Sequence, residues 1–213
     1  GLDTLTPRDR FNVIQFNSQT HSLFMQPEVA TGNNLARARQ YVDRLRADGG
    51  TEMASALSRA LESGVETEAG ERVRQVIFIT DGAVGKEAAL FRQIREQLGS
   101  QRLFTVAIGS APNRHFMREA ARWGRGTYTS IQSPSDVDGP LQALFSAMES
   151  PVLTDIRVNW PGQETGREAF PVRPGDLFQG QPLIHVVRGA PGVGGLRVSG
   201  RLPGGEGGNK RGS

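Results

Sequence analysis

A carboxylate stands at the end of one of the most apolar stretches of the chain. Four apolar residues, Val76 to Ile79, run without polar alternation and lead through Thr80 to Asp81 and Gly82. Such a run predicts a strand covered on both faces, as in a parallel sheet flanked by helices. Ligands of open α/β sheets bind beyond the carboxyl ends of the strands. Asp81 is therefore the first candidate for a functional residue, as a hard oxygen ligand.

A structural role for Asp81 has to be weighed against the functional one. Asp-Gly between apolar runs is also a strong signal for a tight β-hairpin turn. The segment from Lys86 to Leu98 instead carries apolar residues at helical spacing, at Leu90, Phe91, Ile94 and Leu98. This favours a strand, a loop and a helix, and it leaves an ordinary loop aspartate as good an explanation as a ligand.

Thr51 is the second residue with a chemically useful position. It follows Gly49-Gly50 and opens a predicted helix whose apolar face consists of Met53, Ala56, Leu57, Ala60 and Leu61, before Gly64. Threonine is a common helix N-cap. Local evidence favours that capping role over a ligand role for the hydroxyl.

Strands and helices alternate up to about Ser150. The predicted strands cover 11–16, 21–25, 76–79, 103–108 and 127–131. A helix capped by Asn33 or Asn34 is predicted before Gly49, with Leu35, Ala38, Val42 and Leu45 on one face. Two later helices have the apolar faces Phe116, Met117, Ala120, Ala121 and Leu141, Leu144, Phe145, Met148. Residues 1–150 are therefore predicted to form a three-layer, doubly wound α/β domain with a mainly parallel sheet.

The pattern changes beyond Pro151, where apolar and polar residues alternate. Alternation around Ile156, Val158 and Trp160, and again from Leu196 to Leu202, predicts strands with one buried face. A third strand is expected within 176–188, interrupted by Gly180 and Pro182. Three strands do not make a self-sufficient sandwich, so this partial all-β region, 151–203, either leans on the α/β domain or lacks partner strands. The Gly-rich end, 204–213, is predicted to be flexible.

Composition and missing motifs exclude several classes of function. The 213 residues fit one medium domain and a smaller one, and zero cysteines exclude disulfides and thiolate chemistry. No apolar run reaches membrane-spanning length, and the first residues do not read as a signal peptide. The net charge is +3, but the basic residues are scattered along the sequence and form no basic patch, so we do not expect nucleic-acid binding. His21, His115 and His185 are isolated and no catalytic motif is present, so we expect no enzyme.

Five segments together resemble a known family. Gly49-Gly50-Thr51 and Ile79-Thr80-Asp81-Gly82 resemble the von Willebrand factor type A domain. The similarity is closer to the branch of the inter-alpha-trypsin inhibitor heavy chains and their bacterial surface-protein relatives. It covers 2–151, more weakly 176–180, and is carried by the segments 9–16, 45–53, 74–85, 102–113 and 124–128.

The resemblance implies a metal-ion-dependent adhesion site. Thr51 and Asp81 would contribute oxygen ligands to Mg²⁺, or to Mn²⁺ or Ca²⁺, with Gly50, Glu52 and Gly82 on the surrounding rim. A carboxylate of a protein or matrix-type ligand would take an open coordination position. The implied role is a non-enzymatic adhesion or protein-binding module of a secreted or cell-surface protein. The alternatives are a metal-independent intracellular scaffold of the same fold and, more remotely, a nucleotide-binding or hydrolytic enzyme.

One expected motif of the family does not occur in this sequence. The first metal-binding loop, Asp-x-Ser-x-Ser, would precede Gly1, so the chain is expected to be truncated within its first helix. A strand between the Phe11 and Val76 strands would then be missing, and metal binding by this chain would be weak or absent. The two flanking strands would then pair directly, the gap would be filled by another segment, or the isolated chain would be poorly stable because buried backbone groups lack partners.

Overall fold

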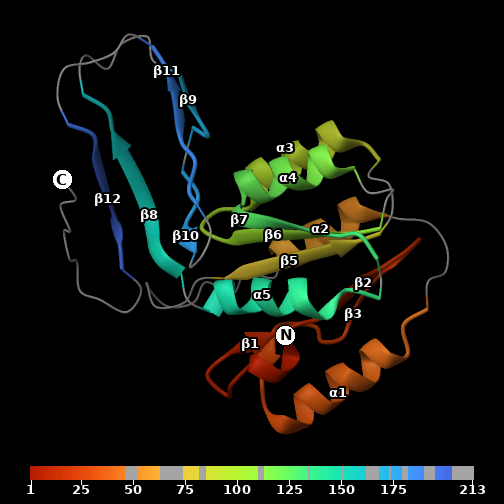
Figure 1. Cartoon of the computed structure of the whole chain (residues 1–213). Helices are drawn as coiled ribbons and strands as arrows, with labels where there is room; N and C mark the ends of the chain where they lie inside the picture. Colours follow the sequence, from red (N-terminus) through yellow and green to blue (C-terminus); the bar gives the residue numbers. More distant parts are fainter. Residues whose placement is uncertain are drawn as a thin grey trace.

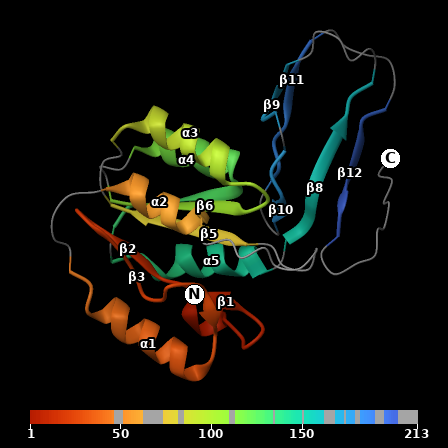
Figure 2. The ribbon, with the colours of Figure 1, turned by 180° about the vertical axis from the view of Figure 1, so that it is seen from behind.

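A computed structural model provides the coordinates of the chain (Figure 1). The structure describes residues 1–46, 52–62, 74–81, 85–109, 113–133, 135–149, 151–161, 168–172, 174–178, 182–189 and 195–202. These residues form an α/β layer structure, an N-terminal unit beneath it and an all-β region at one end (Figures 1 and 2).

The centre of the molecule is a parallel sheet of three strands. Its order is β5 (Gln75–Thr80), β6 (Arg102–Ile108) and β7 (Arg125–Ile131), with register from Gln75↔Arg102 to Thr80↔Ala107 between the first two. The helices α2 (Met53–Glu62), α3 (Glu87–Gln97) and α4 (Arg114–Trp123) pack on one face, and α5 (Asp138–Glu149) packs on the other (Figure 1). The predicted three-layer α/β fold is confirmed.

The apolar faces predicted for α2 and α4 agree closely with the structure, except that Ala60 of α2 is only partly buried. Met53, Ala56, Leu57 and Leu61 are buried on α2, and α4 buries all four residues of its predicted face. Asn113 caps α4, because its side chain accepts a hydrogen bond from the Phe116 N–H at 3.1 Å. Gly124 ends that helix, and its N–H donates to the Ala120 carbonyl at 2.8 Å.

Burial in the sheet differs from the prediction at β5. The expected strand with both faces covered is β6, whose residues Arg102 to Ala107 are all buried. In β5, the residues Val76 to Phe78 are only half-buried and Ile79 is 41% exposed. The reason is position: among the described strands, β5 pairs only with β6 and so forms an edge of the sheet.

The predicted strand 11–16 is two strands, β1 (Arg10–Phe11) and β2 (Ile14–Phe16). Asn12 causes the break. Its Oδ1 accepts from the N–H groups of Val13 and Phe24, and its Nδ2 donates to the Phe24 carbonyl at 2.9 Å. This side chain replaces the ladder bonds that a continuous strand would make. The return strand is β3 (Thr20–Ser22), shorter than the predicted 21–25.

Other parts of the N-terminal unit also depart from the prediction. The strand β4 (Glu28–Val29), which pairs with β1, was not predicted. A short 3-10 turn, η1 (Leu2–Thr4), begins the chain. Helix α1 (Gly32–Asp43) follows β4 and is capped by Thr31, whose side chain accepts a hydrogen bond from the Asn34 N–H. The predicted caps, Asn33 and Asn34, are therefore wrong. Of its predicted apolar face, Ala38 is buried, whereas Val42 is 43% exposed and Leu45, beyond the helix end, is 38% exposed.

The space between β2 and β5 is bridged by side chains. Within the described residues, β2 pairs only with β3, and no strand joins β2 to β5. The rings of Phe16 and Phe78 stack across the boundary with centroids 5.3 Å apart and planes 8° apart. Of the three arrangements considered from the sequence, direct pairing of these two strands is therefore wrong.

The all-β region is antiparallel, as predicted. Strand β8 (Pro151–Asn159) lies between β10 (Leu177–Phe178) and β12 (Arg197–Arg201), and β9 (Glu168–Phe170) pairs with β11 (Val186–Arg188). The single strand expected within 176–188 is thus two strands in different sheets. This region packs against the α/β layers: Phe178 is buried against Phe104, and the ring centroids are 5.4 Å apart. No helix in the described ranges has the length and apolar character needed to cross a bilayer.

A close approach of two backbones makes Gly126 a sensitive position. A Cβ atom there would lie 2.3 Å from the Leu103 carbonyl oxygen, a backbone atom that cannot rotate away. We expect Gly126→Ala to lower the free energy of unfolding by about 2 to 3 kcal/mol, measured by urea denaturation. Gly139→Ala is the matched control, because nothing lies within 4 Å of its Cβ position and it sits in α5. A Gly126→Ala midpoint equal to that of Gly139→Ala would refute the steric argument.

Candidate functional site

Asp81 follows the last residue of β5 and lies at the carboxyl edge of the sheet. Because β5, β6 and β7 are parallel, their carboxyl ends and the segments that follow them share this edge. We call the surface formed by Asn17, Glu52, Asp81, Glu87 and Asn113 the carboxyl rim. The Asp81 side chain is exposed, and among the described residues no hydrogen-bond or ion-pair partner of its carboxylate is found. The sequence-based placement of Asp81 after a strand is correct.

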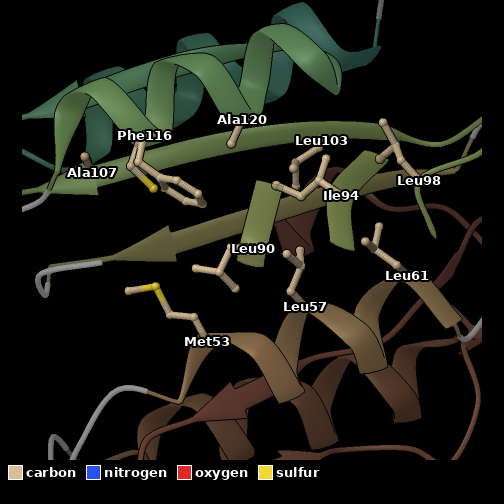
Figure 3. Close-up of a cluster of buried hydrophobic side chains, with 11 residues drawn as sticks. Met53, Leu57, Leu61, Leu90, Ile94, Leu98, Leu103, Ala107, Phe116 and Ala120 are labelled. Atoms are coloured by element: carbon tan, nitrogen blue, oxygen red, sulfur yellow. The ribbon is translucent and has the colours of Figure 1, made fainter. Parts of the chain in front are cut away.

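Helix α2 runs antiparallel to β5 and points its N-terminus at the carboxyl rim. Met53, its first residue, packs in the same core as Phe78, and in Figure 3 it lies toward the arrowhead of β5, with Leu61 toward the strand's start. At the other end, Arg74 donates to the Ala60 carbonyl at 2.6 Å and Gln101 donates to the Leu61 carbonyl at 3.0 Å. Burial lowers the pKa of the Arg74 guanidinium. The start of α2 and the end of β5 therefore share one rim.

Glu52 connects this helix start to the N-terminal unit. Its N–H donates to the Asn17 carbonyl, just beyond β2, at 2.7 Å, and its side chain is exposed. Thr51, the predicted hydroxyl ligand, and the rim residues Gly50 and Gly82 lie outside the described residues. Of the predicted site, the structure thus places Asp81 and Glu52, both on the carboxyl rim.

Two further polar residues of the rim, Glu87 and Asn113, were not singled out as site residues from the sequence. Asn113, the cap of α4, donates through Nδ2 to Oε1 of Glu87 in the first turn of α3. Lys86, which precedes α3, has φ of 52°, a left-handed conformation that is uncommon for a lysine. The signal available in the sequence was their position, since each begins a helix directly after a strand and its loop. The Glu87–Asn113 bond ties together two of the helix starts that frame Asp81.

The described residues of the rim carry carboxylate and amide groups. Asp81 and Glu52 offer carboxylate oxygens, the donors that Mg²⁺ and Ca²⁺ prefer. Within the described ranges, no group of three or more His, Cys, Asp or Glu side chains converges. His21 and His115 are exposed on β3 and α4, and His185 precedes β11 in the all-β region. The three histidines therefore lie on separate elements.

Comparison with known proteins identifies similar sequences. The family model of the von Willebrand factor type A domain matches residues 1–130. A von Willebrand factor A domain-containing protein of Dictyostelium discoideum is 27% identical over 86% of this chain and 22% of its own length. The human inter-alpha-trypsin inhibitor heavy chain H6 is 28% identical over 90% of this chain and 16% of its own length. The chain thus spans about a fifth of the length of these curated relatives.

A solved structure supports the fold. The von Willebrand factor type A protein from Catenulispora acidiphila superposes with a TM-score of 0.69 at 21% sequence identity. The match covers 99% of this chain and 58% of that one, so the similarity includes the all-β region as well as the α/β layers.

Proposed function

Because the chain belongs to the von Willebrand factor type A domain family, we propose that it is a protein-interaction module that binds its partner through a divalent cation on the carboxyl rim. Domains of this family are generally adhesion or protein-interaction modules. The observation that carries the proposal is the position of Asp81: an exposed carboxylate at the end of β5, on the rim toward which α2 points its first turn.

Thr51 and Asp81 are the residues that would hold the cation. A hydroxyl and a carboxylate are hard oxygen donors, and Mg²⁺ tolerates such a small protein ligand set because it keeps several waters. When bound, the cation would supply an open coordination position for a carboxylate of the partner. Glu52 and the residues Gly50 and Gly82 would border the contact surface.

The proposed module acts without turnover. The relatives are von Willebrand factor type A proteins and inhibitor heavy chains, which are generally non-enzymatic. In this proposal, residues 1–150 form the binding module, 151–203 a partial β-sandwich-like region and 204–213 a flexible end. The parent protein would be secreted or on the cell surface, and its partner would be a protein or matrix component with an accessible carboxylate. The alternative is an intracellular scaffold that docks partners without metal.

A calorimetric titration with Mg²⁺ tests the metal ligands. We expect weak binding to this chain, because Thr51 and Asp81 leave most of the coordination sphere to water, and we expect the heat to disappear in Asp81→Ala and Thr51→Ala. Glu87→Gln is the matched control, since that carboxylate already accepts from Asn113. Tight binding that persists in Asp81→Ala would disprove this ligand assignment.

A further inference from the structure

A cleft lies at the other end of the molecule from the carboxyl rim. It has a volume of about 420 Å³ and lies between β8 and the β9–β11 strand pair, and its lining includes Arg125 at the start of β7. We call it the β8 cleft. Figures 1 and 2 both show the β9–β11 pair beside β8, with β10 near the base of the strand. Its volume falls within the range of about 300 to 1,000 Å³ that ligand pockets occupy.

One wall of the β8 cleft is the edge of a strand. Asp155, Ile156, Arg157 and Val158 all line it, although consecutive residues of a strand point to opposite faces. Only the edge can present all four to one cavity. On its other side β8 pairs with β12 from Thr154 to Asn159, whereas β10 pairs only with Leu153 and Pro151. Within the described residues, this edge of β8 has no strand partner beyond Leu153.

The change at Asp155 explains why pairing stops there. Asp155 has φ of 51°, and the ladder between β8 and β12 shifts register beside it. A residue in this conformation kinks the strand. The ladder with β10 ends at Leu153, just before this kink, and the residues from Asp155 to Val158 line the cleft.

The opposite wall carries a buried hydrogen-bond acceptor without a partner. Nε2 of His185 lies 3.0 Å from the Pro171 carbonyl oxygen, so this nitrogen must donate. In the neutral imidazole, Nδ1 is then an acceptor, and it is buried with no hydrogen-bond partner in the described structure. The ring stacks on Trp160 at a centroid distance of 6.1 Å. The stacked rings of Trp160 and His185, which both line the cleft, offer an apolar surface to a ligand.

Charge does not select the ligand. Asp155 and Asp176 line the cleft together with Arg125 and Arg157, so both signs are present in equal number. Asp176 is already paired with the buried Arg102, and Arg125 donates to the carbonyls of Gly99 and Gln101. An uncharged ligand with both donors and acceptors fits such a lining best.

We propose that the β8 cleft binds an extended, uncharged peptide segment of a partner protein, which adds as a strand to the edge of β8 that is unpaired among the described residues. An extended backbone supplies donors and acceptors for the strand edge, and alternate side chains for contact with Trp160 and Val172. The Gly-rich end, residues 204–213, lacks β-branched and aromatic residues, so it is a poor candidate for that strand. In this proposal the occupant is a segment of a partner protein, and the site is separate from the carboxyl rim.

Binding of a peptide to the cleft is measured by the fluorescence of Trp160 in the full chain. The variant Trp123→Phe removes the signal of the other tryptophan. The probe is an N-acetylated, C-amidated hexapeptide of alternating threonine and valine. We expect a saturable change with a dissociation constant of about a millimolar or below. Ala169→Arg, on the cleft wall, is expected to weaken binding at least about tenfold by blocking the cleft. Two control variants are expected to leave the affinity for the peptide unchanged. Val186→Arg lies on β11, which pairs with β9, but outside the cleft lining, and Asp81→Ala lies on the carboxyl rim.

A backbone control identifies the mode of binding. The same hexapeptide with N-methyl groups on alternate amides keeps its side chains but loses its donors on one edge, and we expect it not to bind. Equal affinity for both peptides, or affinity unaffected by Ala169→Arg, would overturn the proposal. Saturable binding of maltohexaose with none of the peptide would assign the cleft to a saccharide instead.

Discussion

Asp176→Ala is expected to lower the free energy of unfolding by about 3 to 5 kcal/mol, because it leaves a buried guanidinium without its counter-charge. Arg102, at the start of β6, donates through Nε to Asp176 Oδ2 and through Nη2 to Oδ1 at 3.2 Å. The two side chains are only 4% and 3% exposed. Asp155 lies 3.7 Å from Arg102 but is half exposed, so it replaces little of the lost interaction. Urea denaturation followed by circular dichroism measures the change.

Two further variants separate charge from packing. The double variant Arg102→Met/Asp176→Leu removes both charges and is expected to recover most of the stability lost in Asp176→Ala. Asp3→Ala removes the exposed pair with Arg39, the residue that lowers the pKa of Asp3, and is expected to leave the urea midpoint unchanged. If Asp176→Ala lowered the free energy of unfolding no more than Asp3→Ala does, the Arg102–Asp176 pair would not stabilise the contact between the all-β region and the sheet.

Phe104→Ala is expected to cost about 3 to 5 kcal/mol, through lost burial and the cavity left behind. The Phe104 side chain is fully buried in the centre of β6 and meets Phe178 of the all-β region edge to face at 5.4 Å. Its removal therefore weakens both the core beneath α5 and the junction with β10. Thermal unfolding and urea denaturation should report the same loss.

Phe170→Ala is the matched control for that change. Phe170 lies on β9 and is 51% exposed, so its truncation should cost far less than that of Phe104. A shift in Phe170→Ala as large as in Phe104→Ala would mean that burial in this structure does not track stability.

The α/β layers could be predicted from the sequence because each depends on a local pattern. The run from Leu103 to Ile108, apolar except for Thr105, specifies a strand with two covered faces, and four residues at helical spacing specify the buried face of α4. The break between β1 and β2 could not be predicted, since Phe11 to Phe16 reads as one strand. It depends on the Asn12 side chain reaching Phe24, a contact that only the folded chain creates.

Long-range features account for the rest of the difference. The partner of Arg102 is 74 residues away in the sequence, and nothing in either local pattern connects them. Likewise, Val76 to Ile79 has the composition of a central strand, but its burial is decided by which strands lie beside it. The position of Asp81 was predictable because it needs only a parallel strand and its end. Its role as a metal ligand came from the resemblance and remains a prediction.

In the proposed mode of binding, one divalent cation binds at the carboxyl rim with Asp81 as a ligand. Titration of isotope-labelled protein with Mn²⁺, followed by paramagnetic broadening of backbone amide signals, tests it even when binding is weak. We expect the signals of Glu52, Asp81 and Asn113 to broaden first and those of Gln101 and Asp155, at the opposite end, to stay sharp. We expect Asp81→Ala to abolish the effect. Broadening centred on the opposite end, or unchanged in Asp81→Ala, would contradict it.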